Sequence, residues 1–126
     1  VEQLSCRPDF SVLVYPVVTF TKEYTHVGSM ENLLGKDADP DLVQHFSNEL
    51  QVTEHTPPAI LIHSGDDQAV PVENSIVYYH ALQKKNISSE LHIYPYGGHG
   101  YSLAIGQGHL STWPDRVTEW IKYIHQ

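Results

Sequence analysis

Three short runs of apolar residues recur along the chain, separated by longer amphipathic or polar stretches. Residues 11–18 and 59–63 are continuously apolar and rich in β-branched side chains, which is typical of strands buried on both faces of a parallel sheet. Residues 90–94 form a shorter run that partly alternates between apolar and polar positions. We therefore expect three parallel strands.

Helical patterns lie between these runs and after them. Asp39 can cap a helix that has Pro40 in its first turn and that ends near Asn48. Residues 73–85 keep their apolar side chains on one stripe, as an amphipathic helix does. A last helix is expected to start near Thr112, with an acidic residue three positions later forming an imperfect capping box.

Residues 19–36 show no such period. Glycine at positions 28 and 35 interrupts the apolar residues, so we expect a long loop with about one turn of helix. Strands that alternate with helices imply βαβ crossovers, and the predicted fold class is α/β with about three parallel strands and flanking helices. Neither a repeat nor a linker divides the sequence, so we expect a single domain over residues 1–126.

The charge balance excludes several classes of partner. Seven basic and fifteen acidic residues give a formal net charge of −8, which repels nucleic-acid phosphates and leaves no basic stripe for anionic lipid. No apolar run approaches the roughly twenty residues that span a bilayer. Cys6 is the only cysteine, which excludes an internal disulfide and two-cysteine zinc spacings. We expect no nucleic acid, membrane, metal or other cofactor as a partner.

Two aspartates and a histidine follow the second and third predicted strands. Asp66 and Asp67 would lie at the carboxyl edge of the sheet, where active sites of open α/β sheets collect, although aspartates there can simply form turns. His99 follows Gly97 and Gly98 and would reach the same edge, where a general base needs an orienting carboxylate beside it. An acid and then a histidine on successive strand ends is the order of an α/β-type serine hydrolase.

Other candidate groups are weaker. The chain contains no Gly-x-Ser-x-Gly elbow, and Ser29, with glycine only before it, is not nominated as a nucleophile. His63 and His92 lie inside strand patterns and are interpreted as packed or edge residues, and no His-x-x-x-His pair suggests a metal site. The acidic run at 37–41 lacks the glycine and distal glutamate of a calcium loop, so helix capping explains it better.

Several motifs are informative as a set. They are Glu-Asn-Leu-Leu-Gly-Lys-Asp at 31–37, Phe-Ser-Asn-Glu-Leu at 46–50, Thr-Pro-Pro at 56–58, Gly-Asp-Asp-Gln-Ala-Val-Pro at 65–71 and Gly-Gly-His-Gly-Tyr at 97–101. Together they resemble the carboxyl-terminal half of α/β-hydrolase esterases of the acetyl esterase and acetylxylan esterase type, some of which are called xylanases. Dienelactone hydrolases and prolyl oligopeptidases are related to these enzymes and share the single motifs.

The resemblance implies roles for two residues. Asp67, in an Asp-x-x-Val-Pro loop, would orient and stabilise the imidazole of His99, and His99 would deprotonate a serine and later protonate the leaving alcohol. The nucleophile elbow and the His-Gly-Gly oxyanion motif of such esterases have no counterpart in these residues. We therefore expect a partial α/β-hydrolase fold without its first strands, inactive in isolation, whose parent hydrolyses short-chain acyl esters.

Two alternatives stay open, and both concern partners. The chain could be a noncatalytic interaction or scaffold module, or half of a split esterase completed by a chain that supplies the serine. A buried strand at residues 11–18 would have one unpaired edge, which predicts a homo-oligomer or association with the N-terminal half of the hydrolase. The expected substrate of the parent is an acylated carbohydrate or a small ester.

Overall fold

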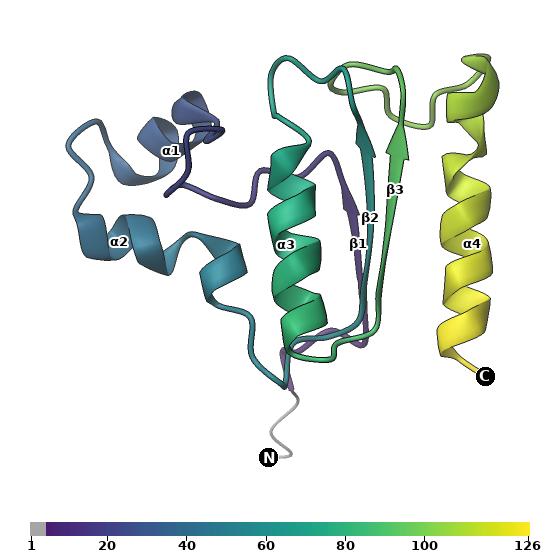
Figure 1. Ribbon diagram of the computed structural model, residues 1–126, viewed down its shortest axis with the longest axis horizontal. Coiled ribbons are helices and arrows are strands. Elements are labelled where there is room, and N and C mark those ends of the chain that lie inside the picture. The colour runs from purple at the N-terminus through teal and green to yellow at the C-terminus, as the bar shows by residue number, and fades with distance from the viewer. Residues whose placement is uncertain (1–4) are drawn as a thin grey trace.

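The computed structural model describes residues 5–126 and contains one three-stranded parallel sheet. Its strands are β1 (Ser11–Val14), β2 (Ala59–Ser64) and β3 (Ser89–Tyr94), in the order β1-β2-β3. The strands run side by side in one direction, so their carboxyl ends meet at one edge (Figure 1). The predicted α/β fold with three parallel strands is confirmed.

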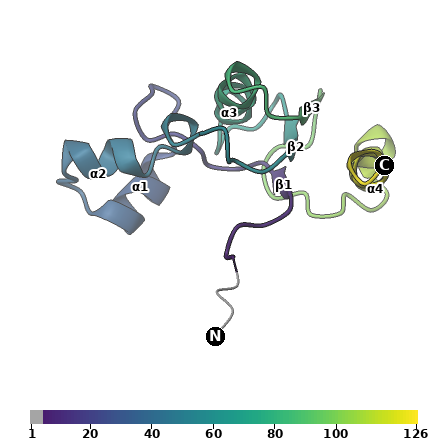
Figure 2. The same ribbon diagram turned by 90° about the horizontal axis from the view of Figure 1, so that it is seen from below.

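Two helices cover opposite faces of this sheet. They are α3 (Glu73–Lys84) and α4 (Trp113–Ile124), and a view along the strands places the sheet between them (Figure 2). Every residue of β2 is buried, because the central strand has a covered face on each side. Ile60 and Ile62 belong to the cluster with Trp120 of α4, whereas Leu61 belongs to the cluster with Leu82 of α3.

β1 is shorter than the sequence predicts. It was expected to reach residue 18, but it ends at Val14, because Tyr15 adopts a φ of 40° and Pro16 has no N–H to donate. The chain then leaves the sheet. The backbone N–H groups of Val18 and Thr19 donate instead to the side-chain oxygen of Asn74 in α3, at 3.0 and 3.2 Å.

Residues 19–50 form an outer segment beside α3 and contain more helix than predicted. The expected loop at 19–36 includes α1 (Val27–Leu34), a helix of eight residues. Its start is fixed by His26, whose ring nitrogen accepts the backbone N–H of Ser29, and Gly35, with a φ of 87°, ends it. The sequence predicts only about one turn of helix here, because histidine is an uncommon cap and Gly28 weakens the pattern.

The remaining helices lie close to their predicted positions. Asp39 caps α2 (Pro40–His45) as predicted, and the chain continues through a 3₁₀ turn, η1 (Asn48–Leu50). A second 3₁₀ turn, η2 (Gly108–Thr112), precedes α4. The predicted capping box at Thr112 is wrong, because the hydroxyl of that residue donates to the carbonyl of His109 rather than capping α4. None of the helices within residues 5–126 has both the length and the hydropathy of a membrane-spanning segment.

Candidate active site at the carboxyl edge of the sheet

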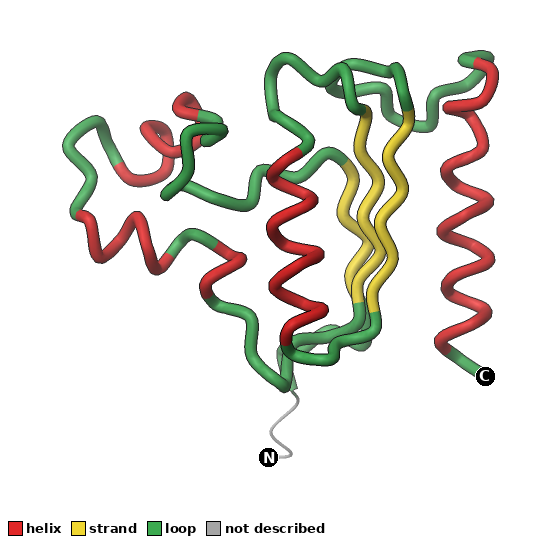
Figure 3. Tube along the Cα trace, in the orientation of Figure 1, coloured by secondary structure: helices red, strands yellow, loops and turns green. Residues whose placement is uncertain are grey.

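The loops that follow β2 and β3 lie together at the edge where these strands end (Figure 3). Asp67, in the loop after β2, is 6% exposed. One carboxylate oxygen, Oδ1, accepts the backbone N–H groups of Ala69 and Val70 at 2.9 and 2.8 Å. The carboxylate thereby closes its own turn, and Oδ2 is left to contact other residues. The side chain of Asp67 therefore both closes the turn and presents a charged oxygen to its neighbours.

His99 meets that second oxygen. Its Nδ1 lies 2.8 Å from Oδ2 of Asp67, and its side chain is 37% exposed. The ring of Tyr15, just after β1, packs against the imidazole in an edge-type arrangement with ring centroids 4.7 Å apart. Residues from the ends of all three strands therefore meet here. The structure brings the two predicted catalytic residues, Asp67 and His99, into hydrogen-bond contact.

The backbone of the His99 loop is held in place by the other aspartate. The carboxylate of Asp66 accepts the N–H of Gly98 at 2.8 Å, and the hydroxyl of Ser64 donates to the carbonyl of Gly98. Gly97 adopts a φ of 145°, and a Cβ there would lie 2.8 Å from the side chain of Leu110. Only glycine fits this position, so the loop can pass close to the end of β2. Asp66 positions the loop backbone, and Asp67 contacts the ring.

The charge on Asp67 is stabilised despite its burial. Burial favours the neutral acid, but hydrogen bonds from Val70 N–H, from His99 and from Ala69 N–H, together with the nearby imidazole, outweigh it and hold the Asp67 pKa below its usual value. An ionised carboxylate can only accept, so Nδ1 of His99 must donate. In neutral His99 the other nitrogen, Nε2, therefore carries the free lone pair that a general base needs.

A second histidine contacts the same carboxylate. His63 is fully buried in β2, as its interpretation as a packed residue predicts, but its Nε2 also lies 3.2 Å from Oδ2 of Asp67. This contact was missed. The available signal was the spacing of four residues between His63 and Asp67 across a strand end and a tight turn.

The other residues considered from sequence do not join this site. Ser29 lies at the start of α1, where its Oγ is 2.8 Å from Nδ1 of His26. His92 in β3 contacts Glu90 at 3.0 Å. Among residues 5–126, no group of three or more histidine, cysteine or acidic side chains could hold a metal ion.

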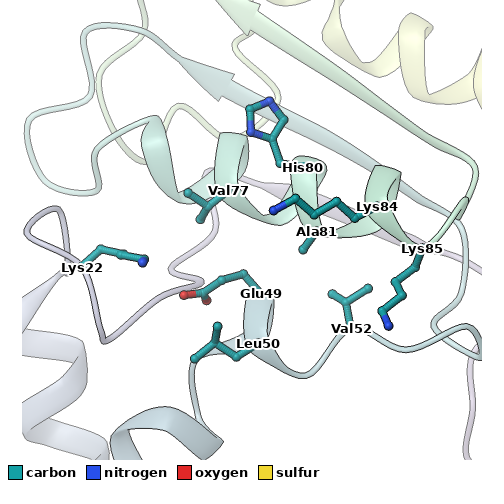
Figure 4. A pocket seen from close by; sticks show the side chains of 9 residues that line it. All are labelled: Lys22, Glu49, Leu50, Val52, Val77, His80, Ala81, Lys84 and Lys85. Carbon is teal, nitrogen blue, oxygen red and sulfur yellow. The ribbon is translucent and has the colours of Figure 1, made fainter.

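A cavity of about 490 Å³ lies apart from Asp67 and His99, between α3 and η1 (Figure 4). It is lined by Lys22, Glu49, Leu50, Val52, Val77, His80, Ala81, Lys84 and Lys85. Neither Asp67 nor His99 is among these residues, so this cavity is not a substrate pocket for the pair.

Residues 8–125 match the sequence model of the prolyl oligopeptidase family. The chain belongs to the prolyl oligopeptidase family. It is 37% identical over 122 residues to an acetylxylan esterase of Xylanibacter ruminicola, covering 94% of this chain and 25% of that protein. It is also 41% identical over 101 residues to endo-1,4-beta-xylanase B of Butyrivibrio fibrisolvens, covering 80% of this chain and 16% of that protein.

Solved structures agree with this assignment. The acetyl ester-xyloside bifunctional hydrolase of Caldicellulosiruptor lactoaceticus is 43% identical and superimposes with a TM-score of 0.95, covering 98% of this chain and 45% of that one. A carboxylesterase of Lactobacillus plantarum, at 21% identity and a TM-score of 0.80, shares the fold. This prolyl oligopeptidase-family chain spans about half the length of these structures. The resemblance to acetylxylan esterases is thereby confirmed.

Proposed function

We propose that this chain supplies the acid and the base of a serine esterase of the α/β-hydrolase type. The observation that carries the proposal is the 2.8 Å contact between Nδ1 of His99 and Oδ2 of Asp67, with the imidazole partly open to solvent. The carboxylate is buried and ionised, so it favours the imidazolium that forms when a base takes up a proton. The 126 residues contain no Gly-x-Ser-x-Gly, and the nucleophile is assigned to polypeptide outside them.

In this reaction Nε2 of His99 takes the proton from a serine hydroxyl as the serine oxygen bonds to the ester carbonyl carbon. The resulting imidazolium then gives that proton to the alcohol oxygen as the ester C–O bond breaks, which leaves an acyl-serine. Water repeats the sequence, releasing the carboxylic acid and restoring the serine. Asp67 keeps its charge throughout and holds the ring with Nδ1 protonated.

Short acyl esters of carbohydrates are the proposed substrates of the complete enzyme. The support comes from relatives: one similar protein is an acetylxylan esterase and one similar structure is an acetyl ester-xyloside bifunctional hydrolase. They are 37% and 43% identical to this chain.

The isolated chain is proposed to be inactive, because it holds neither the nucleophile nor its oxyanion donors. A triad without its serine retains a rate several powers of ten below that of the intact enzyme, even with the oxyanion groups present. We expect no hydrolysis of p-nitrophenyl acetate above the buffer rate and no labelling by a fluorophosphonate probe. Rapid turnover with stoichiometric labelling would overturn this part of the proposal.

The catalytic assignment is tested in a longer polypeptide. The DNA upstream of the Val1 codon is expected to encode a Gly-x-Ser-x-Gly segment, and the extended chain is expected to hydrolyse p-nitrophenyl acetate. In that chain Asp67→Asn should lower kcat by about four powers of ten, the loss seen when a triad aspartate of a serine protease is replaced. His99→Ala should cost at least as much. An extended chain that keeps its activity in both variants would exclude the proposed roles.

The open edge of β1 supports a proposal about partners. The N–H groups of Ser11 and Tyr15 donate to Pro58, just before β2, and to Ile62, so Val12 directs its own N–H away from the sheet, and Val12 is 36% exposed. We propose that two copies of the isolated chain pair through this edge. Val12→Pro removes the outward donor without touching the β2 ladder, so it should shift a dimer to monomers in sedimentation, whereas Val12→Thr should not. A wild-type monomer at high concentration would contradict the proposal.

A further inference from the structure

His63 occupies the strand position between the two loops of the candidate site. Successive residues of a strand point to opposite faces, and His63 and Ser64 are the last two of β2. Ser64 points toward the His99 loop, where its hydroxyl donates to Gly98, whereas His63 points toward α3 and the Asp67 loop. The last two residues of β2 therefore contact both loops of the candidate site, Ser64 on one face of the sheet and His63 on the other.

The hydrogen bonds of His63 define its protonation. Its Nε2 lies 2.9 Å from the backbone oxygen of Val70, and a carbonyl oxygen can only accept, so Nε2 carries a proton. The hydroxyl of Ser75, 2.7 Å from Nδ1, can then donate to the remaining nitrogen. Both nitrogens are used in the neutral ring, and burial lowers the His63 pKa, which also favours that form.

We infer that His63, fixed by Ser75, is a positioning residue that holds the Asp67 carboxylate in the orientation that His99 requires. Nε2, which carries the proton, lies 2.9 Å from Val70 O and 3.2 Å from Oδ2 of Asp67, so it ties the carboxylate to the turn that carries it. The inference rests on the proposed function, because it assigns His63 a role only through the Asp67–His99 pair.

Neutrality is what makes this arrangement useful. Two imidazoles face the same carboxylate oxygen, His63 at 3.2 Å and His99 at 2.8 Å. A cationic His63 would compete with His99 for the charge of Asp67 and would oppose formation of a second imidazolium nearby. A neutral His63 restrains the carboxylate by hydrogen bonding and leaves its charge to stabilise His99. The hydroxyl of Ser75 favours the neutral form, because it can donate to Nδ1.

The test measures the hydrogen bond between Asp67 and His99 rather than stability alone. The exchange rate of the His99 Nδ1 proton with water is read by ¹⁵N-edited NMR on the labelled chain, which requires no esterase activity. His63→Leu should speed this exchange at least about tenfold, the factor that corresponds to losing one restraining hydrogen bond. His63→Gln keeps an amide donor near the same position and should stay within about threefold of the wild type.

Val52→Ala is the matched control, because it removes buried volume on the same face of the sheet without touching Asp67. It should leave the exchange rate within about twofold of the wild type. If His63→Leu does not fold, Ser75→Ala decides: loss of the hydroxyl should speed exchange by about threefold or more. A folded His63→Leu, or in its place Ser75→Ala, that behaves like Val52→Ala would overturn the inference.

Failure of the inference and failure of the proposed function give different spectra. If the wild type shows no protected Nδ1 proton on His99, or one that Asp67→Asn leaves unchanged, the Asp67–His99 pair and the role of His63 are both excluded. If that proton depends on Asp67 but not on His63, only the inference about His63 is wrong.

Discussion

The sheet with α3 and α4 and the outer segment of residues 19–50 are held in place by different forces. β2 is buried along its whole length and packs on α3 and α4 through apolar side chains. In the outer segment, α1, α2 and η1 contain no buried residue. This segment is attached mainly by hydrogen bonds from a few polar side chains to the backbone.

Asn74 attaches the outer segment to α3, and Ser47 joins parts of that segment to each other. The amide oxygen of Asn74 accepts from Val18 and Thr19, while its nitrogen donates to Tyr24 O at 3.0 Å and to Pro71 O at 3.1 Å. The side chains of Asn74 and Ser47 are fully buried. Ser47 accepts the N–H of Phe20 and donates to a carbonyl of α2. Apolar burial fixes the sheet and its helices, whereas satisfied polar groups fix the outer segment.

The largest effect is expected from a cavity in the sheet. Ile62→Ala removes a side chain that is fully buried between β2 and α4, and it should lower the free energy of unfolding by about 2–5 kcal/mol. Urea denaturation followed by circular dichroism measures the change. A loss below 1 kcal/mol would show that apolar burial contributes too little to the stability of the sheet to be the force that holds it together.

A smaller and more local effect is expected from Asn74→Ala. It leaves the N–H groups of Val18 and Thr19 without their acceptor, at a cost of about 1–3 kcal/mol for a buried unsatisfied group. Amide hydrogen exchange should accelerate more in residues 19–50 than in β2. Asn74→Asp, which keeps the acceptor but not the donors, should fall between the alanine variant and the wild type. Equal acceleration of amide exchange in residues 19–50 and in β2 would contradict a separate polar attachment of the outer segment.

Acid should weaken the sheet region through His63 and Asp67. Because the pKa of His63 is lowered in the folded protein, this histidine takes up a proton in the unfolded chain at a higher pH than in the folded one. The stability that neutral His63 contributes is therefore complete above about pH 6.5 and falls as the pH drops below that value. The lowered Asp67 pKa adds a second loss, which starts near pH 4 and continues through the lowered value. The unfolding free energy, measured from pH 8 to pH 3, should fall in both of these pH ranges.

Two variants distinguish the losses of stability in these two pH ranges. His63→Gln should flatten the decline between pH 7 and pH 5, and Asp67→Asn should flatten the decline below pH 4. A wild-type curve that rises on acidification between pH 7 and pH 5 would contradict the assigned direction for His63.

The smallest effect is expected on the exposed face of the outer segment. Val27 and Leu33 in α1 are 54% and 57% exposed, so changing either to serine should alter the unfolding free energy by no more than about 0.5 kcal/mol. Thermal unfolding measures this. A larger loss would reveal apolar packing of α1 and would remove the contrast between the two regions.

The same contrast explains what the sequence could predict. The strands were predictable because burial on both faces, as at Leu61, leaves continuous apolar runs, and α3 was predictable from its periodic apolar stripe. The site was predictable as far as Asp67 and His99, because parallel strands bring their following loops to one edge. α1 and the roles of Asp66 and His63 depend on hydrogen bonds made by particular side chains, mostly to the backbone. Asp66 bonds Gly98, 32 residues away, and no local pattern encodes such a contact.

The tautomer of His99 decides whether Asp67 holds this imidazole with Nδ1 protonated and Nε2 free to act as a base. The ¹⁵N chemical shifts of the His99 ring at pH 8 report that tautomer. We expect the Nδ1–H tautomer in the wild type and a shift toward Nε2–H in Asp67→Asn. A wild-type ring that is protonated on Nε2, or a tautomer that is the same in both proteins, would contradict the proposed role of Asp67.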